Sequence, residues 1–144
     1  MKRYFFISTF VVALSITGFS QKEVAPPVSA KASFEKSFAG SSKVKWEKEG
    51  AGYEVNFVQN GQEMSAVFNS KGVLQETETE IKQSELPAAA SDYVKQHYKG
   101  GKIKETAKIT KANGEVNYEV NINGKDVMFD SHGKHIKDVK EPKD

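Results

Sequence analysis

The feature that most constrains the fold of this chain is an internal repeat. Short matches occur in the same order in its two halves, which favours duplication of one unit over chance similarity. The matches, first half against second, are Tyr53-Glu54-Val55-Asn56 with Tyr118-Glu119-Val120-Asn121, Asn60-Gly61 with Asn123-Gly124, Phe68-Asn69-Ser70-Lys71-Gly72 with Phe129-Asp130-Ser131-His132-Gly133, and Pro27, Phe34, Phe38 and Gly40 with Pro87, Val94, Tyr98 and Gly100. The sequence therefore predicts two tandem units, at residues 27–81 and 86–140.

Each unit is predicted to form one helix followed by four antiparallel strands. Proline suits the first turn of each helix and glycine suits its end, and Ser84 could cap the second helix. Asn-Gly pairs between alternating apolar runs are typical of two-residue hairpin turns, because both residues tolerate positive φ. The expected strands are 43–49, 52–59, 62–69 and 73–80, then 103–111, 115–122, 125–130 and 134–140. This pattern predicts an α+β fold of two tandem helix-plus-four-stranded antiparallel sheet units, with the helices packed on one face of the sheets.

Alternation along the strands indicates which side chains are buried. Successive side chains point to opposite faces of a sheet, and we expect the helix of each unit to cover the apolar parity. That parity holds Val44, Trp46, Tyr53, Val55, Phe57, Met64, Ala66, Phe68, Ile103, Ala107, Ile109, Val116, Tyr118, Val120, Ile122, Val127 and Phe129. The opposite parity is expected to be solvated, and it holds Lys45, Glu47, Glu54, Asn56, Glu63, Ser65, Asn69, Lys104, Thr106, Lys108, Asn117, Glu119 and Asn121.

Residues 1–20 have the pattern of a secretory signal peptide. Met1-Lys2-Arg3 is basic, residues 4–19 carry no charge, and small residues precede Gln21. A membrane anchor is the alternative, but a span needs roughly 20 predominantly apolar residues and this stretch is diluted by Ser and Thr. We expect cleavage near Ser20/Gln21, no membrane span in the mature chain, and a periplasmic or secreted product with tails at 21–26 and 141–144.

Charge and cysteine content exclude several function classes. Two of the 21 Lys and Arg residues, and none of the 19 Asp and Glu residues, lie in the signal segment, so the mature chain has no net charge. Its basic residues are all Lys, which argues against a nucleic-acid partner, since such binders usually carry a basic excess and favour Arg. The absence of cysteine excludes disulfides, a thiol nucleophile and cysteine-ligated metals.

This organisation resembles exported bacterial PepSY-like proteins, a family that is similar to the beta-lactamase inhibitory protein. The resemblance is carried by the tandem units, by Trp46 followed by Tyr53-Glu54-Val55-Asn56-Phe57, by Val67-Phe68-Asn69-Ser70-Lys71-Gly72, and by Leu86-Pro87 at the second helix. It covers essentially all of residues 27–140. The resemblance implies a non-enzymatic role, in which the protein binds or inhibits another envelope protein such as a peptidase or a beta-lactamase.

The sequence departs from tight inhibitors of that architecture. Such inhibitors present aromatic residues on the exposed sheet face, and interface hot spots favour Trp, Tyr and Arg. Here the strand aromatics share the parity predicted to be buried, and the only arginine is Arg3. We therefore predict an exported, non-catalytic binding or regulatory protein that modulates a peptidase or another envelope protein through its exposed sheet face. The alternative is a carrier of a small polar ligand or a metal in the envelope.

The candidate partner-binding residues are Glu54, Asn56, Glu119 and Asn121. Each Glu-x-Asn pair lies on the outward parity of a strand predicted to be central in its unit. If the units adjoin, the four side chains could form one polar patch for a peptide or another polar ligand. The alternative is that duplication simply copied a solvated strand.

His132 and His135, with Asp130 nearby, form the densest group of metal-ligating residue types. They could hold Zn²⁺ or Cu²⁺, but no third ligand is fixed by spacing. We therefore expect an exposed turn histidine and a strand-surface histidine, and we expect His97 at the boundary of the second helix's apolar stripe.

Glu76, Glu78 and Glu80 alternate along one predicted strand. A Ca²⁺ site needs roughly six to eight oxygens at a shaped loop, so we interpret these carboxylates as a solvated edge strand that resists aggregation. The sequence also lacks a Gly-x-Ser-x-Gly elbow for a serine triad. No catalytic residue, cofactor site or metal site is assigned.

Overall fold

The computed structural model describes residues 23–140, which form an α+β fold of two α-helices and one eight-stranded antiparallel sheet. The elements are α1 (Val28–Ser37), β1 (Ser42–Glu49), β2 (Gly52–Gln59), β3 (Gln62–Phe68), β4 (Leu74–Glu80), the 3-10 helix η1 (Gln83–Glu85), α2 (Ala88–His97), β5 (Ile103–Lys111), β6 (Val116–Ile122), β7 (Lys125–Asp130) and β8 (His135–Lys140). Both helices and all eight strands expected from the sequence are confirmed, with strand ends within one residue. The signal segment, its cleavage site and the tail at 141–144 lie outside the described residues.

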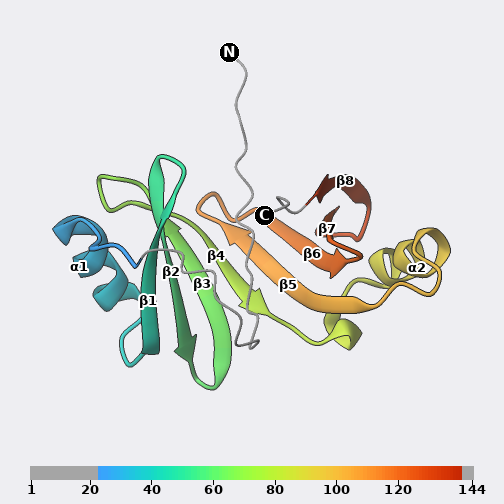
Figure 1. The fold of residues 1–144 in the computed structure, drawn as a ribbon, viewed down its shortest axis with the longest axis horizontal. Coiled ribbons are helices and arrows are strands. Elements are labelled where there is room, and N and C mark those ends of the chain that lie inside the picture. The colour runs from blue at the N-terminus through green and yellow to red at the C-terminus, as the bar shows by residue number, and fades with distance from the viewer. Residues whose placement is uncertain (1–22, 141–144) are drawn as a thin grey trace, which may run out of the picture.

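The strands follow one another across the sheet in chain order, from β1 at one edge to β8 at the other. Figure 1 shows the two helices at opposite ends of this sheet, with β4 and β5 in its middle. The β4–β5 pairing joins the two halves of the chain, with Thr77 opposite Thr110 and Glu78 opposite Ile109. The expectation that the Glu76–Glu80 segment is an edge strand is therefore wrong, because β5 occupies its free side.

Equivalent turns in the two halves share their geometry. Asn60 and Asn123 both have positive φ, at 53° and 56°, as the first residue of a two-residue hairpin turn requires. The Asn69 Oδ1 atom accepts the backbone N–H groups of Lys71 and Val73, at 2.9 and 3.0 Å. The Asp130 Oδ1 atom accepts those of His132 and Lys134 at the same two distances. Asn and Asp thus close the same loop in each half.

The two helices also begin and end alike. Each has ten residues, begins after a proline, and ends where the next N–H group donates to a carbonyl four residues back: Phe38 to Phe34 and Tyr98 to Val94. No side chain caps the start of α2, so the expectation that Ser84 caps it is wrong. Ser84 instead lies in η1, one helical turn earlier along the chain.

Two clusters of buried side chains combine helix and sheet residues. The first contains Ala30 and Phe34 with Trp46, Val55, Phe57, Ala66 and Phe68; the second contains Ala90 and Val94 with Leu86, Val120, Ile122, Val127 and Phe129. Every Phe, Tyr and Trp between residues 23 and 140 either belongs to one of these clusters or packs against it. The sheet residues of both clusters lie on one face of the sheet. The pairing that shows this continues from strand to strand through Met64, Thr79, Lys108, Tyr118 and Phe129. We call this the helix face, and its opposite the polar face.

The predicted alternation fails in β5. Its pairing with β6 shifts between Ile103 and Glu105, which is the signature of a β-bulge. Beyond the shift, Ala107 lies opposite Glu119 and Ile109 opposite Asn117, so both apolar residues lie on the polar face. Thr106 and Lys108 lie instead on the helix face, contrary to the expectation that they point the other way. One extra residue in a strand exchanges the faces of all residues after it.

Candidate functional site

The four predicted partner-binding residues lie on the polar face, on β2 and β6. Glu54, Glu119 and Asn121 are only 4%, 5% and 6% exposed, and Asn56 is half-buried. The expectation that this face is solvated is therefore wrong at its centre. A carboxylate withdrawn from water costs free energy unless it is paired or protonated, so these residues define a chemically unusual site.

Glu78 lies between the two predicted pairs and brings them into one electrostatic group. It sits on β4, two strands from Glu54 on β2 and two strands from Glu119 on β6. Across β3, the small side chain of Ser65 lies between Asn56 and Glu78. Across β5, Ile109 lies opposite Glu78, and Ala107, two residues along the strand, lies opposite both Glu80 and Glu119. The carboxylates of Glu119 and Glu54 both act on Glu78, after burial itself, to raise its pKa well above the ordinary value.

Further acidic residues extend this group across β5 and β7. Asp126, which is 1% exposed, lies opposite Asn121 and accepts a hydrogen bond from its Nδ2 atom at 2.8 Å. Glu105, on β5, also pairs with Asn121 in the register. We call Glu54, Glu76, Glu78, Glu105, Glu119 and Asp126 the acidic centre.

Several oxygen atoms of the acidic centre are buried without a hydrogen-bond donor among the described residues. They include Oε1 of Glu78, Oε1 of Glu105 and Oε2 of Glu119. Buried polar groups in native proteins are nearly always hydrogen-bonded, so each such oxygen is an exception that calls for an explanation. Glu78 is the clearest case, because the whole residue is only 5% exposed and lies among other carboxylates.

Burial and mutual repulsion hold protons on these groups. Burial, with the nearby Asp126 carboxylate, raises the pKa of Glu119 to about 9. Burial also raises the pKa of Glu105 to about 7, with Glu80 and Glu63 adding to the effect. The pKa of Glu76 is raised by burial and partly lowered again by Lys111. Part of the acidic centre is therefore protonated at neutral pH, and its charge depends on its surroundings.

Two lysines contact carboxylates at the margins of the polar face. Lys45 Nζ lies 2.8 Å from Glu47 Oε1 near the β1 edge. Lys111 Nζ lies 2.7 Å from Glu115 Oε1 at the β5–β6 turn, and Lys111 is opposite Glu76. Lys45 and Lys111 therefore already have carboxylate partners in Glu47 and Glu115.

The sequence contained only part of the signal for this site. Duplication of Glu-x-Asn singled out Glu54 and Glu119, which the structure places on one continuous face. The roles of Glu78 and Glu105 were missed, because both depend on β4 pairing with β5 and on the bulge in β5. The alternation of Glu76, Glu78 and Glu80 was the available signal, but it could equally describe an exposed strand.

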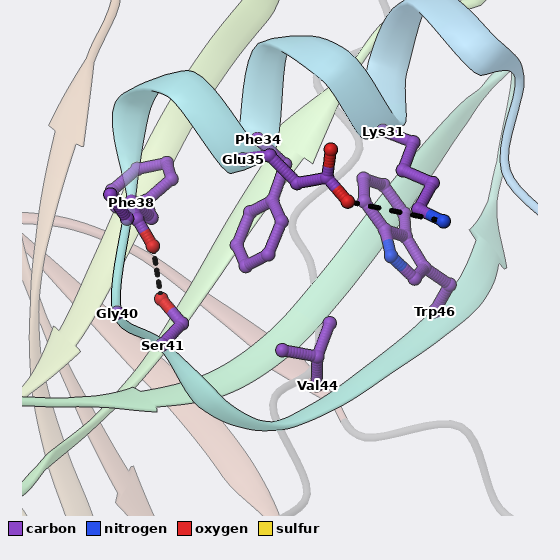
Figure 2. A pocket seen from close by; sticks show the side chains of 9 residues that line it. Lys31, Phe34, Glu35, Phe38, Gly40, Ser41, Val44 and Trp46 are labelled. Carbon is purple, nitrogen blue, oxygen red and sulfur yellow. Dashed lines mark hydrogen bonds and ion pairs between the residues drawn. The ribbon is translucent and has the colours of Figure 1, made fainter.

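A second feature is a groove of about 480 Å³ between α1 and β1. Figure 2 shows Phe34, Val44 and Trp46 around it, with Ser41 at one end. Its polar groups are partnered: Ser41 Oγ donates to the Phe38 carbonyl at 2.6 Å, and Lys31 lies 3.9 Å from Glu35. An apolar groove whose polar groups are already engaged does not suit a small polar ligand.

The histidines do not converge on a common ligand position. His132 is exposed in its turn, with Nδ1 3.2 Å from Ser131 Oγ. His135 lies on the helix face, where it stacks on Tyr93 at 4.5 Å between ring centroids and contacts Asp138 at 2.8 Å. Asp130 is engaged with backbone N–H groups of its own turn. Within residues 23–140, no three His, Asp or Glu side chains are grouped so that they could hold a metal ion.

The length and hydropathy of a helix decide whether it can cross a membrane. Neither α1 nor α2, within the described residues, is long and apolar enough to cross a membrane.

Comparison with protein families gives one match. The family described as "Putative beta-lactamase-inhibitor-like, PepSY-like" matches residues 19–75 and residues 51–137, which together span more than half of the chain. No curated protein matches the chain significantly.

Solved structures share the fold at low sequence identity. A structure described as a periplasmic protein from Bacteroides eggerthii has a TM-score of 0.74 at 15% identity, with 81% of this chain and 90% of that chain covered. A DUF2874 family protein from Bacteroides uniformis has a TM-score of 0.71 at 17% identity, with the same coverage. A BLIP-like protein from Bacteroides fragilis has a TM-score of 0.63 at 23% identity, with 84% and 92% covered. These likenesses show the fold.

Proposed function

This chain belongs to the PepSY-like family of beta-lactamase-inhibitor-like proteins, and we propose that it is an exported, non-catalytic protein that binds a partner through its polar sheet face. The partner is an envelope protein or peptide, a peptidase being one candidate. The observation that carries the proposal is the acidic centre, where Glu78, Glu105 and Glu119 have buried oxygens without donors among the described residues. A partner that supplies donors there would relieve the cost of their burial.

Duplication explains how such a face arises. We take the chain to consist of two copies of one unit, residues 27–81 and 86–140, as the matching helix ends and loop hydrogen bonds support. Each copy contributes one Glu-x-Asn pair, at Glu54 and Asn56 and at Glu119 and Asn121. Joining the copies edge to edge through β4 and β5 gives one face with both pairs.

Export is part of the same proposal. Residues 1–20 have a signal-peptide pattern, and the solved structures with this fold include one described as periplasmic. We propose cleavage near Ser20/Gln21 and a periplasmic or secreted location.

Beta-lactamase inhibition is less well supported than binding in general. The described aromatic side chains all belong to the clusters on the helix side, so none is available on the polar face as an interface anchor. The alternative of a small-ligand or metal carrier has weaker support still, since the groove by α1 is apolar and His132 and His135 point to different surroundings.

Site-specific photo-crosslinking tests the proposal. A photoreactive amino acid at Glu80 samples the rim of the polar face, and the same group at Lys108 samples the helix face one strand away. Both residues are exposed, so the pair is matched in accessibility. In cells that naturally produce the protein, we expect one defined adduct from position 80 that is absent from position 108.

The adduct must depend on the face itself. Excess unlabelled wild-type protein should compete it away. Identical adducts from both positions, or no adduct from position 80, would refute binding through this face.

A further inference from the structure

We propose that the acidic centre around Glu78 receives the lysine or arginine side chains of a basic partner segment. This inference rests on the proposed binding function and names the chemistry of the partner. Three observations support it: the arrangement of carboxyl groups on the polar face, the buried oxygens without donors, and the carboxyl groups that continue to an exposed rim.

The first step concerns what the buried oxygens lack. Oε1 of Glu78, Oε1 of Glu105 and Oε2 of Glu119 are acceptors without donors among the described residues. A carboxyl group in this position can hold a proton or, when a cationic donor reaches it, form charge-assisted hydrogen bonds to an ammonium or guanidinium group, which are stronger than hydrogen bonds between neutral groups. Because Glu78 is nine-tenths buried and lies among other carboxylates, any cation that reaches it meets several acceptors.

The second step concerns the route to these oxygens. An exposed carboxylate lies next to the acidic centre. It belongs to Glu80, which is at the end of β4 and opposite Ala107. Glu63 and Glu80 are both close enough to Glu105 to raise its pKa. Carboxyl groups therefore run from an exposed rim to the buried Glu78. The exposed carboxylate of Glu80 would attract a positive partner, whose cationic side chains could then displace protons from the buried groups.

The third step concerns the spacing of the charges. Glu54, Glu78 and Glu119 lie on β2, β4 and β6, and alternate strands are about 10 Å apart. A single metal ion needs its oxygen ligands within about 2.6 Å, and the described residues contain no such group of three acidic or histidine side chains. Separate charges at this spacing suit the long, flexible side chains of several lysines or arginines instead.

Calorimetric titration with a short oligolysine, hexalysine, tests the inference on the purified mature protein. We expect binding at low salt that weakens as salt is raised, as contacts between charges should. Glu78→Gln should weaken it roughly tenfold, which corresponds to the loss of one charge-assisted contact. The matched control is Glu35→Gln, which makes the same substitution on exposed α1 and should leave the affinity unchanged.

Folding of the variants is checked independently. Glutamine has the shape of a protonated glutamate, so Glu78→Gln should retain the circular dichroism spectrum and the melting transition of a folded protein. A second variant, Glu119→Gln, should show the same loss of affinity from a different strand.

Four outcomes would overturn the inference. They are no binding of hexalysine, equal binding by Glu78→Gln and wild type, binding of Ca²⁺ or Mg²⁺ but not hexalysine, and binding of free spermidine at least as tight as that of hexalysine. The last two would assign the site to a metal or to a polyamine.

The inference and the proposed function can fail separately. If crosslinking identifies a partner at position 80 whose binding is unaffected by Glu78→Gln, the function stands and the basic-segment inference falls. If hexalysine binds through Glu78 but no cellular partner is crosslinked, the site chemistry stands and the proposed function falls.

Discussion

At the scale of single residues, the charge of the polar face and the pH dependence of stability are set by which of its carboxyl groups are protonated. Burial raises the pKa of Glu119 to about 9 and that of Glu105 to about 7, from an ordinary value of 4.5. The folded state therefore binds more protons than the unfolded state between pH 4.5 and 9. Stability must fall as pH rises through this range, because deprotonation is easier in the unfolded chain.

This linkage predicts the behaviour of Glu119→Gln. The variant keeps the shape of the protonated side chain and removes the cost of burying a charge, so we expect it to be about 2 kcal/mol more stable than wild type near pH 8. Between pH 5 and pH 9 its unfolding free energy should also fall less steeply. Urea denaturation at several pH values measures both effects, and Glu35→Gln on α1 is the control. A stability loss with an unchanged pH slope would contradict the account.

Residue placement was predictable from the sequence only as far as the alternation held. Phe57 and Phe68 were predicted to be buried because the period-two pattern of β2 and β3 is uninterrupted, and the structure confirms this. Ile109 was assigned to the wrong face because the bulge after Ile103 adds a residue without any marker such as glycine. The burial of Glu54 was missed because polar side chains on a strand normally indicate solvent.

At the scale of elements, each helix is fixed by a loop that returns to its first turn. The loop after β3 carries Gly72, which has φ of +80°, and a Cβ atom there would lie 2.6 Å from the Ser29 carbonyl carbon. The loop after β7 carries Gly133, with φ of +82°, and a Cβ atom there would lie 2.7 Å from the Ala90 nitrogen. Residues other than glycine are disfavoured at these positions for two reasons: the backbone is left-handed, and a Cβ atom would clash with the helix.

A pair of glycine substitutions separates these two effects. Gly72→Ala should destabilise the protein by the left-handed strain of about 1 kcal/mol plus a steric cost of roughly 1–3 kcal/mol. Gly114→Ala is the matched control, because Gly114 has φ of +83° but a Cβ atom there would meet no described atom within 4 Å. Unfolding free energies in urea give the comparison. Equal losses for the two variants would mean that the contact with α1 is unimportant.

The helices and strands were largely predictable from the sequence, but the pairing of β4 with β5, which joins the two halves, was not. Asn60-Gly61 and Asn123-Gly124 mark hairpins because few other residue pairs accept two positive φ angles. Nothing comparable marks the β4–β5 pairing, which is formed across η1 and α2. A long connection carries no turn signal, so β4 looked like an edge strand.

At the scale of the whole molecule, one continuous sheet couples the unfolding of the two halves. The first cluster contains Trp46 and the second contains Phe129, and β4 and β5 connect them by backbone hydrogen bonds. Each half alone is about the size at which a domain becomes marginal. We therefore expect the described fold to unfold in a single transition.

The single tryptophan makes this cooperativity measurable. Phe129→Ala should destabilise the protein by about 3 kcal/mol, since it removes a fully buried side chain of the second cluster. Trp46 fluorescence reports the first cluster, and circular dichroism reports both halves. Both signals should shift to the same lower urea midpoint. Fluorescence that keeps the wild-type midpoint would show that the halves unfold independently.

The same continuity places the acidic centre where both halves contribute to it, and its protonation is the most direct measure of the binding account. Carboxyl ¹³C chemical shifts of the mature protein, followed against pH by NMR, report each glutamate separately. We predict that Glu119 titrates near pH 9 and Glu105 near pH 7 in the free protein, and that hexalysine lowers both values. Titration of both groups near pH 4.5, or values that hexalysine leaves unchanged, would contradict a buried acidic site that binds cations.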